Sequence, residues 1–233
     1  CEGLVHILGE EALQHLGQLR EAVDPLAQVR QFSQGGGGVA AAIKKPIDFL
    51  TRTEAKALLS APDQQTWSGR RDRALLLLAL QTGLRLSEII NLCCQDIALG
   101  TGAHVRCTGK GRKTRCIPLR KETVATLRAW LRERNAQPLD PLFPNVRGKP
   151  LSRDGVQYLL TKHVTSARQQ CPSLKNRRVS PHVLRHSTAM DLLQCGVDRS
   201  VIALWLGHER MDTTQIYLHA SLELKEKALA KTE

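Results

Sequence analysis

The chain has 233 residues, 42% of them hydrophobic, which is enough for one large or two small globular domains with an ordinary core. A formal net charge of +12 favours a partner rich in phosphate, and an aromatic content of 3% leaves little means of stacking on unpaired bases, so duplex DNA is the better expectation. No apolar run reaches the ~20 residues needed to span a bilayer, and no Cys-x-x-Cys pair suggests a zinc site or a redox couple. We therefore expect a reduced, cytoplasmic protein.

The first 45 residues differ in character from the remainder. Residues 1–34 carry five acidic and two basic side chains and predict a weakly amphipathic helix over Leu4–Arg30. The run Gln34-Gly35-Gly36-Gly37-Gly38 breaks this pattern. We expect an N-terminal helical segment over 1–34, a glycine-rich linker over 35–45 and the main domain over 46–233.

Helical signals dominate the beginning of the main domain. Thr53 is a suitable N-cap for a helix over Glu54–Ser60. The run Arg73–Leu80 is apolar all round, which predicts a helix buried on every side, and Gly83 can supply the left-handed residue that ends it. A second helix is expected to begin at about Leu86.

Residues 104–119 predict the one sheet. His104–Thr108 and Thr114–Leu119 are short β-like runs, and the basic, glycine-containing turn between them indicates a hairpin. Start and stop signals predict further helices over Glu122–Arg134, Arg153–Arg168 after Ser152, Pro181–Gln194 with Ser180 as N-cap, Asp198–Leu206 before Gly207, Thr213–Leu218 and Leu222–Lys231. The expected fold class is mainly α with a small antiparallel β-sheet (α+β).

Five segments carry side chains suited to phosphodiester chemistry. In chain order they are Thr82-Gly83-Leu84-Arg85-Leu86-Ser87-Glu88, Thr108-Gly109-Lys110-Gly111 with Lys113-Thr114-Arg115, Ser180-Pro181-His182-Val183-Leu184-Arg185-His186, Leu206-Gly207-His208 and Thr213-Thr214-Gln215-Ile216-Tyr217. The ordered set resembles the tyrosine recombinase family, also called phage-type integrases, and in particular its Xer-like members. The resemblance runs from about Lys45 to about Ser221 and implies the tyrosine recombinase catalytic-domain architecture.

Breaking a phosphodiester requires a nucleophile, cations on the non-bridging oxygens and an acid for the leaving oxygen. The resemblance implies that Tyr217 is the nucleophile and that Arg85 and Arg185 bind the scissile phosphate, for which planar guanidiniums are suited. It also implies that His182 accepts or relays the tyrosine proton and that His208 donates a hydrogen bond to the phosphate.

Lys110 and Glu88 complete the implied catalytic set. The resemblance assigns Lys110 to protonation of the 5′ leaving oxygen, which suits a lysine because its pKa can be lowered, whereas that of an arginine cannot. Lys113, in the same turn, competes for this role. Glu88 falls on the first helical turn after Arg85, and the resemblance makes it a supporting carboxylate that orients the site.

Each of these residues, taken alone, also has an ordinary interpretation. Arg85 would be a surface arginine, and His208 would interact with the dipole of the helix that ends before it. His182 and Arg185 lie three apart on one helical face and would form structural hydrogen bonds. The order of the five segments favours the catalytic interpretation over these.

Two residues are assigned to structure rather than to the site. His186 is adjacent in sequence to Arg185 but points about 100° away on the helix. Tyr158 lies in an apolar stretch and is interpreted as a buried tyrosine whose hydroxyl bonds to the backbone.

The resemblance implies a site-specific recombinase or integrase that forms a covalent 3′-phosphotyrosine intermediate at Tyr217, without metal, ATP or another cofactor. The implied assembly is a homo-tetramer on paired duplex DNA sites in the nucleoid, and a monomer or weak oligomer without DNA. A type IB topoisomerase has a similar residue set and stays an alternative, as does a non-catalytic DNA-binding factor. A metallohydrolase is disfavoured because the eight histidines include no His-x-x-x-His pair with a helical carboxylate.

One feature departs from the family pattern. Members usually carry a helical DNA-binding domain before the catalytic domain, and residues 1–34 are too short and too acidic for that domain. We interpret them as a remnant of a DNA-binding arm, which puts DNA affinity and unaided recombination by this chain in doubt.

Overall fold

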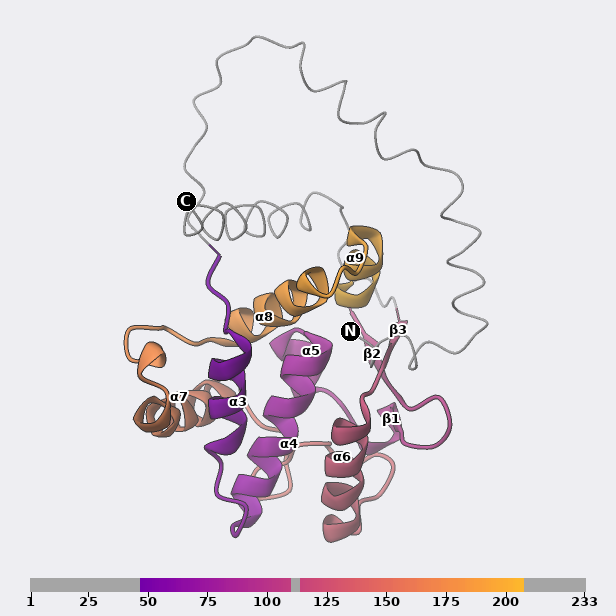
Figure 1. The fold of residues 1–233 in the computed structure, drawn as a ribbon. Helices are drawn as coiled ribbons and strands as arrows, with labels where there is room; N and C mark the ends of the chain where they lie inside the picture. The colour runs from indigo at the N-terminus through magenta and orange to yellow at the C-terminus, as the bar shows by residue number, and fades with distance from the viewer. Residues whose placement is uncertain (1–46, 110–113, 208–233) are drawn as a thin grey trace, which may run out of the picture. The chain divides into compact units, whose positions relative to one another are not determined.

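The computed structural model describes residues 47–109 and 114–207 (Figure 1). All of them belong to the second of the chain's two structural units, which begins at Ile47. Several features predicted above lie outside the described residues: the helix Leu4–Arg30, the glycine-rich linker, Lys110, Lys113, His208, Tyr217 and the two helices predicted after Gly207.

The described chain is mainly helical with one small sheet, as predicted. The helices are α3 (Arg52–Ser60), α4 (Trp67–Thr82), α5 (Leu86–Ile90), α6 (Lys121–Arg134), α7 (Arg153–Gln170), α8 (Pro181–Gln194) and α9 (Arg199–Leu206). The strands β1 (Ile97–Ala98), β2 (His104–Thr108) and β3 (Thr114–Pro118) form an antiparallel sheet in the order β1-β2-β3. Strand β1 is absent from the sequence prediction because two residues are too short to show an alternating pattern.

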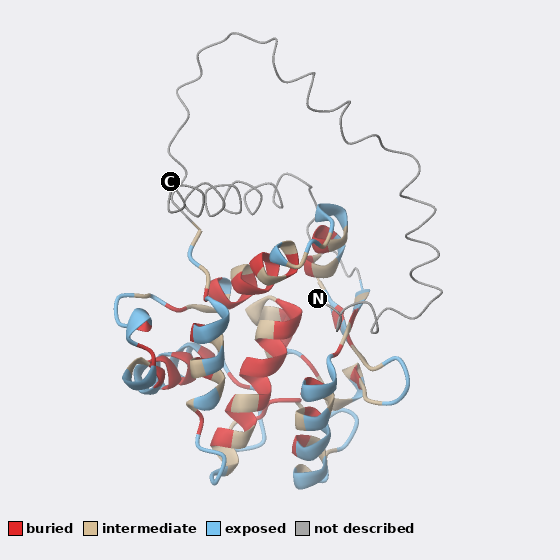
Figure 2. Ribbon diagram, viewed as in Figure 1, coloured by how far each residue is buried: buried red, intermediate tan, exposed pale blue. Residues whose placement is uncertain are grey.

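Helix α4 lies at the centre of the main hydrophobic core (Figure 2). It packs against α3, α6 and α8, so almost every side of it is covered. Leu75, Leu76 and Leu78 are each no more than 1% exposed, which confirms the helix predicted to be buried on every side. Gly83 ends the helix with a φ of 62°, a conformation that costs an L-residue with a Cβ about 1–2 kcal/mol.

A second, smaller core joins α8 to α9. Ala189, Met190 and Leu192 of α8 are buried together with Ile202 and Leu206 of α9. This packing places the C-terminal end of α9 beside the turn at Gly83, because a Cβ on that glycine would lie 2.6 Å from Leu206 Cδ2.

The helix termini follow local signals, with one correction. The predicted N-caps Ser152, Ser180 and Asp198 each accept a backbone hydrogen bond, and Gly207 ends α9 with a φ of 65°. Helix α3, however, is capped by Thr51 and not by Thr53. The Thr51 hydroxyl accepts from the N–H of Glu54 while the Glu54 carboxylate accepts from the N–H of Thr51, and this reciprocal pair starts the helix earlier.

The prediction for Tyr158 is wrong. Its side chain is on the outside of α7, and the residue is 73% exposed. Val156, Leu159 and Leu160 occupy the buried face of this helix, and the 3.6-residue period turns Tyr158 toward solvent. The apolar composition of the stretch therefore reflects its neighbours and not the tyrosine.

We expect Gly83→Ala to lower the free energy of unfolding by about 3 kcal/mol, because the new methyl group would be strained at positive φ and would also meet Leu206 and Thr188. Gly102 has a similar φ of 68°, but a methyl group added there would meet nothing within 4 Å, so Gly102→Ala isolates the conformational cost of about 1 kcal/mol. Urea denaturation of both variants measures the difference. Equal losses would show that the contact between the turn and α9 is unimportant for stability.

Candidate active site

Arg85 occupies the short connection between α4 and α5, where its backbone is the N-cap of α5. Its N–H donates to Glu88 Oε2 at 2.7 Å, and its guanidinium donates to Glu88 Oε1 at 3.2 Å. A further guanidinium nitrogen donates to the carbonyl of Gly207 at 2.8 Å. The side chain remains 38% exposed, so it is held on its inner side and open to solvent on the other.

Glu88 is the buried anion of this region, with 4% of its side chain exposed. Besides Arg85 it binds Arg115, whose two terminal nitrogens each donate to one carboxylate oxygen at 2.9 Å. Burial raises the pKa of Glu88, but the hydrogen bonds from Arg115 and from the Arg85 backbone, with the charges of both arginines, outweigh it and bring the pKa below its ordinary value. The group is therefore a carboxylate at neutral pH.

His182 and Arg185 lie in the first turns of α8, after the Ser180 cap. Arg185 is only 7% exposed and donates to the carbonyl of Gly83 at 2.6 Å and to that of Leu206 at 2.7 Å. His182 is exposed on the same helical face. The turn at Gly83 thus brings the two arginines together although they are far apart in the sequence.

His186 is half-buried one residue farther along α8. Burial lowers the pKa of this imidazole, and the electrostatic influence of the nearby His182 and Arg185 side chains lowers it further. It does not line the pocket described next, in keeping with a structural role.

A pocket of about 280 Å³ brings the predicted residues together. Arg85, His182 and Arg185 line it, next to the first turns of α5 and α8. A third wall comes from the beginning of α7, which contributes Arg153, Asp154 and Gln157. The sequence analysis did not predict that these α7 residues line the pocket, because no local pattern indicates that the start of α7 packs beside α5.

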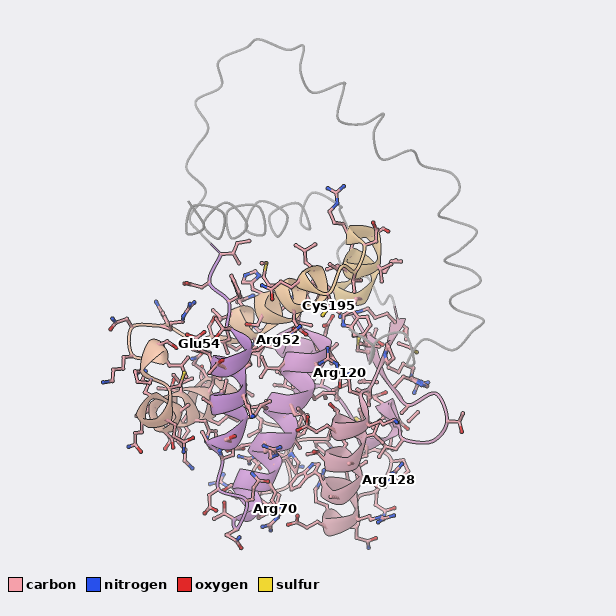
Figure 3. The ribbon with its side chains drawn as sticks, in the orientation of Figure 1. Arg52, Glu54, Arg70, Arg120, Arg128 and Cys195 are labelled. Carbon is pink, nitrogen blue, oxygen red and sulfur yellow. The ribbon has the colours of Figure 1, made fainter. Side chains whose placement is uncertain are left out.

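Polar contacts from other elements hold α8 and the loop that precedes it; Arg52, Glu54 and Arg120, which make these contacts, are labelled in Figure 3. Asp191 accepts from Arg52 of α3 at 2.9 Å and from Arg120, the residue before α6, at 3.3 Å. At the other end, the loop that leads to Ser180 is fixed by buried Glu54, which accepts from Ser173 at 2.8 Å and pairs with Arg177 at 3.0 Å. These contacts add to the core packing that positions α8, the helix that carries His182 and Arg185.

The C-terminal end of α9 is covered by guanidiniums. Three successive carbonyls, those of Trp205, Leu206 and Gly207, accept hydrogen bonds from Arg115 Nε at 3.1 Å, from Arg185 and from Arg85. Such carbonyls lack partners within the helix and carry its negative dipole end, so cations are favourable there. His208 is the next residue in the sequence.

Arg115 is the residue that the sequence analysis missed. It belongs to the hairpin motif, but the sequence alone assigns it no role because several basic residues surround the same turn. The available signal was its position on β3, because alternation places it on the same face as buried Ile117. A cation on the inward face of a strand needs a buried partner.

The arrangement suits an oxyanion with several oxygens. Each guanidinium carries five N–H donors, so one side chain can contact protein carbonyls and a phosphate together. No group of three or more His, Cys, Asp or Glu side chains within 47–109 and 114–207 is placed to hold a metal ion. In the same residues no helix is long and apolar enough to cross a membrane. The catalytic roles of all the predicted site residues stay predictions, and Lys110, His208 and Tyr217 lie outside the described residues.

We expect Glu88→Gln to lower the free energy of unfolding at pH 7 by about 3 kcal/mol, because two guanidiniums lose their buried anion. The folded-state pKa of Glu88 is depressed, so its stabilisation is present above the ordinary value of 4.5 and is lost as the pH falls through the folded value. The difference between the variant and the unmodified protein therefore shrinks in acid. Glu133→Gln, which breaks a surface pair with Arg70, is the control and costs about 0.5 kcal/mol. Denaturation curves at pH 7 and pH 3.5 test both, and a difference that stays constant with pH would contradict the assignment.

Comparison with known proteins supplies the family. The model that describes the phage integrase family matches residues 48–223 of this chain. The putative integrase/recombinase y4rC of Sinorhizobium fredii is 61% identical over 186 residues, covering 80% of this chain and 56% of that protein. Tyrosine recombinase XerC of Pelotomaculum thermopropionicum is 37% identical over 193 residues, covering 79% and 61%.

A solved structure agrees with these relatives. The crystal structure of the XerH site-specific recombinase bound to palindromic difH substrate, a post-cleavage complex, superposes with a TM-score of 0.70 and 26% identity, covering 86% of this chain and 58% of that one. The chain thus spans little more than half the length of the proteins that it resembles. With the matched residues, the helical fold and its small sheet in agreement, the chain belongs to the phage integrase family of tyrosine recombinases.

Proposed function

We propose that this chain is the catalytic part of a site-specific DNA recombinase that cleaves and rejoins duplex DNA through a covalent 3′-phosphotyrosine at Tyr217. The observation that carries the proposal is the pocket in which Arg85, His182 and Arg185 meet. Two guanidiniums beside an imidazole provide charge and hydrogen-bond donors for a phosphodiester that gains negative charge as it is attacked. The relatives named as recombinases and integrases support the same reaction.

The proposed reaction consists of two transfers at one phosphorus. The phenol oxygen of Tyr217 attacks, the bond from phosphorus to the 5′ oxygen breaks, and Lys110 protonates that oxygen while His182 accepts the phenol proton. Arg85 and Arg185 bind the non-bridging oxygens. The 5′ hydroxyl of a partner strand then attacks the phosphotyrosine and releases the tyrosine, with the proton transfers reversed.

Two supporting roles follow from the same scheme. His208 donates a hydrogen bond to the phosphate, and Glu88 holds Arg85 from its inner side. The phosphotyrosine conserves the energy of the broken bond, so rejoining requires no ATP. Positively charged side chains stabilise the transition state, and the proposal includes no cofactor.

The proposed partner is duplex DNA that carries recombination sites, in the cytoplasm at the nucleoid. The XerH complex with its DNA substrate supports this choice. We also propose a homo-tetramer on paired sites and a monomer or weak oligomer without DNA. Residues 46–233 would form the catalytic domain, preceded by the linker 35–45 and the helical segment 1–34.

The nucleophile can be tested by removing one oxygen atom. We expect Tyr217→Phe to abolish the covalent protein–DNA adduct on a nicked duplex substrate and to leave duplex binding within about three-fold, because only the attacking group is lost. Tyr158→Phe is the matched control, since this exposed tyrosine of α7 is outside the pocket lining, and it should form adduct normally. Denaturing gels and gel shifts give the two readings. An adduct that persists in Tyr217→Phe would assign the nucleophile to another residue.

The general acid can be separated from the phosphate-binding residues by changing the leaving atom. A sulfur at the 5′ bridging position leaves as a thiolate without protonation, so it should restore most of the cleavage that Lys110→Ala loses on ordinary DNA. The same substrate should not restore Arg85→Ala, whose loss is electrostatic. Lys113→Ala decides between the two lysines. Rescue of this variant in place of Lys110→Ala would mean that Lys113 is the acid.

A further inference from the structure

Arg115 faces the interior of the domain. In the β2–β3 pair it lies opposite Cys107, which is 3% exposed, whereas the neighbouring pair Arg106 and Cys116 has exposed side chains. The Arg115 side chain is 15% exposed, against 53% for Arg106. Burial on the same face raises the pKa of the Cys107 thiol to about 11.

The Arg115 guanidinium joins three elements at one point. From β3 it reaches both oxygens of Glu88 in α5 at 2.9 Å, and its Nε donates to the Trp205 carbonyl of α9 at 3.1 Å. It also packs against Gly207, where a Cβ would lie 2.9 Å from its Cζ and Nη1. Glycine at this position therefore allows the close approach as well as the positive φ.

Arg85 binds the same two partners, Glu88 and the end of α9, from the side of the pocket. The bond from the Arg85 guanidinium to Glu88 is long, at 3.2 Å, whereas Arg115 binds the carboxylate in the bidentate geometry that is the strong form of this interaction. The buried anion is thus neutralised mainly by Arg115. Arg85 is left half-exposed and able to direct donors into the pocket.

We propose that Arg115 is a positioning residue for DNA strand cleavage: it neutralises Glu88 so that Arg85 stays directed at the scissile phosphate, and it fixes the end of α9. Without Arg115, Arg85 would be the remaining guanidinium on a buried carboxylate and would be drawn inward, away from the phosphate. The last carbonyls of α9 would lose one of three cations at the same time. A displacement of about 1 Å in a reacting group can cost about 100-fold in rate.

This inference depends on the proposed function for its effect on cleavage, and its test uses the full chain. We expect Arg115→Met to slow single-turnover cleavage of a nicked duplex at saturating DNA by about 100-fold, while the DNA dissociation constant changes less than about three-fold. Arg106→Met removes the same charge from the outer face of the same sheet and should stay within about two-fold of the unmodified protein. Arg115→Lys keeps the charge without the bidentate geometry and should remain slow.

A second substitution distinguishes positioning from simple loss of stability. If unneutralised Glu88 draws Arg85 inward, then Arg115→Met combined with Glu88→Gln should cleave about ten-fold faster than Arg115→Met alone, because the attracting charge is gone. A double variant no faster than the single one would overturn the proposal, as would Arg115→Met with the rate of Arg106→Met. If Arg115→Met does not fold, the double variant is compared with Glu88→Gln alone, and equal rates would support the proposal.

Amide hydrogen exchange in the DNA-free protein gives a reading that needs no activity. The amides of Leu206 and Gly207 should exchange about ten-fold faster in Arg115→Met and be unchanged in Arg106→Met, because the guanidinium holds the end of α9. Unchanged exchange in both would overturn the positioning of α9. A wild-type chain that forms no adduct while this difference appears would instead refute the proposed function and leave the structural part of the inference standing.

Discussion

Burial of the Glu88 carboxylate among guanidiniums is the constraint on which the site depends. An isolated charge in this position would be strongly unfavourable, so the fold must bring cations to it from elsewhere in the chain. Arg115 arrives from the sheet and Arg85 from the turn after α4. Both guanidiniums also donate to carbonyls at the end of α9. Through these two arginines, the Glu88 carboxylate is linked to the sheet, to the turn after α4 and to α9.

The buried helix α4 fixes the position of the turn that carries Arg85. Because α4 is covered by α3, α6 and α8, its C-terminal end at Gly83 has a fixed place in the core. The carbonyl of Gly83 accepts from Arg185, and the residue itself contacts Leu206. Burial of leucine side chains along α4 therefore contributes to the placement of the two arginines, although none of these α4 leucines lines the pocket.

Among the arginines of residues 47–109 and 114–207, the structure distinguishes a group that holds α8 from a group that lines the pocket. Arg52, Arg120 and Arg177 hold α8 and its preceding loop through acidic partners. Arg85 and Arg185 contact backbone carbonyls at the turn after α4 and at the end of α9, and both of them line the pocket. A high net positive charge alone does not distinguish these groups, because the difference lies in what each guanidinium faces.

Most of the helices were predictable from the sequence because their signals act over three or four residues. The bounds of α8 follow from Ser180, Pro181 and the turn at Gly196, and those of α9 from Asp198 and Gly207. Caps and left-handed glycines are local hydrogen-bonding and φ requirements, and they do not depend on the rest of the fold. The N-cap of α3 was predicted at Thr53, but the reciprocal hydrogen bonds between Thr51 and Glu54 begin the helix earlier.

The ordered motifs also led to the family and to Arg85, His182 and Arg185 before any contact was known. Only the tertiary structure decided that Arg115 belongs with them, that α7 forms a wall of the pocket and that Tyr158 faces solvent. A sequence motif records which side chains are present, whereas pairing across a sheet and packing between distant helices determine which of them meet. Charge neutralisation in a buried place is such a long-range property, and it became visible once β3, α5 and α9 were seen together.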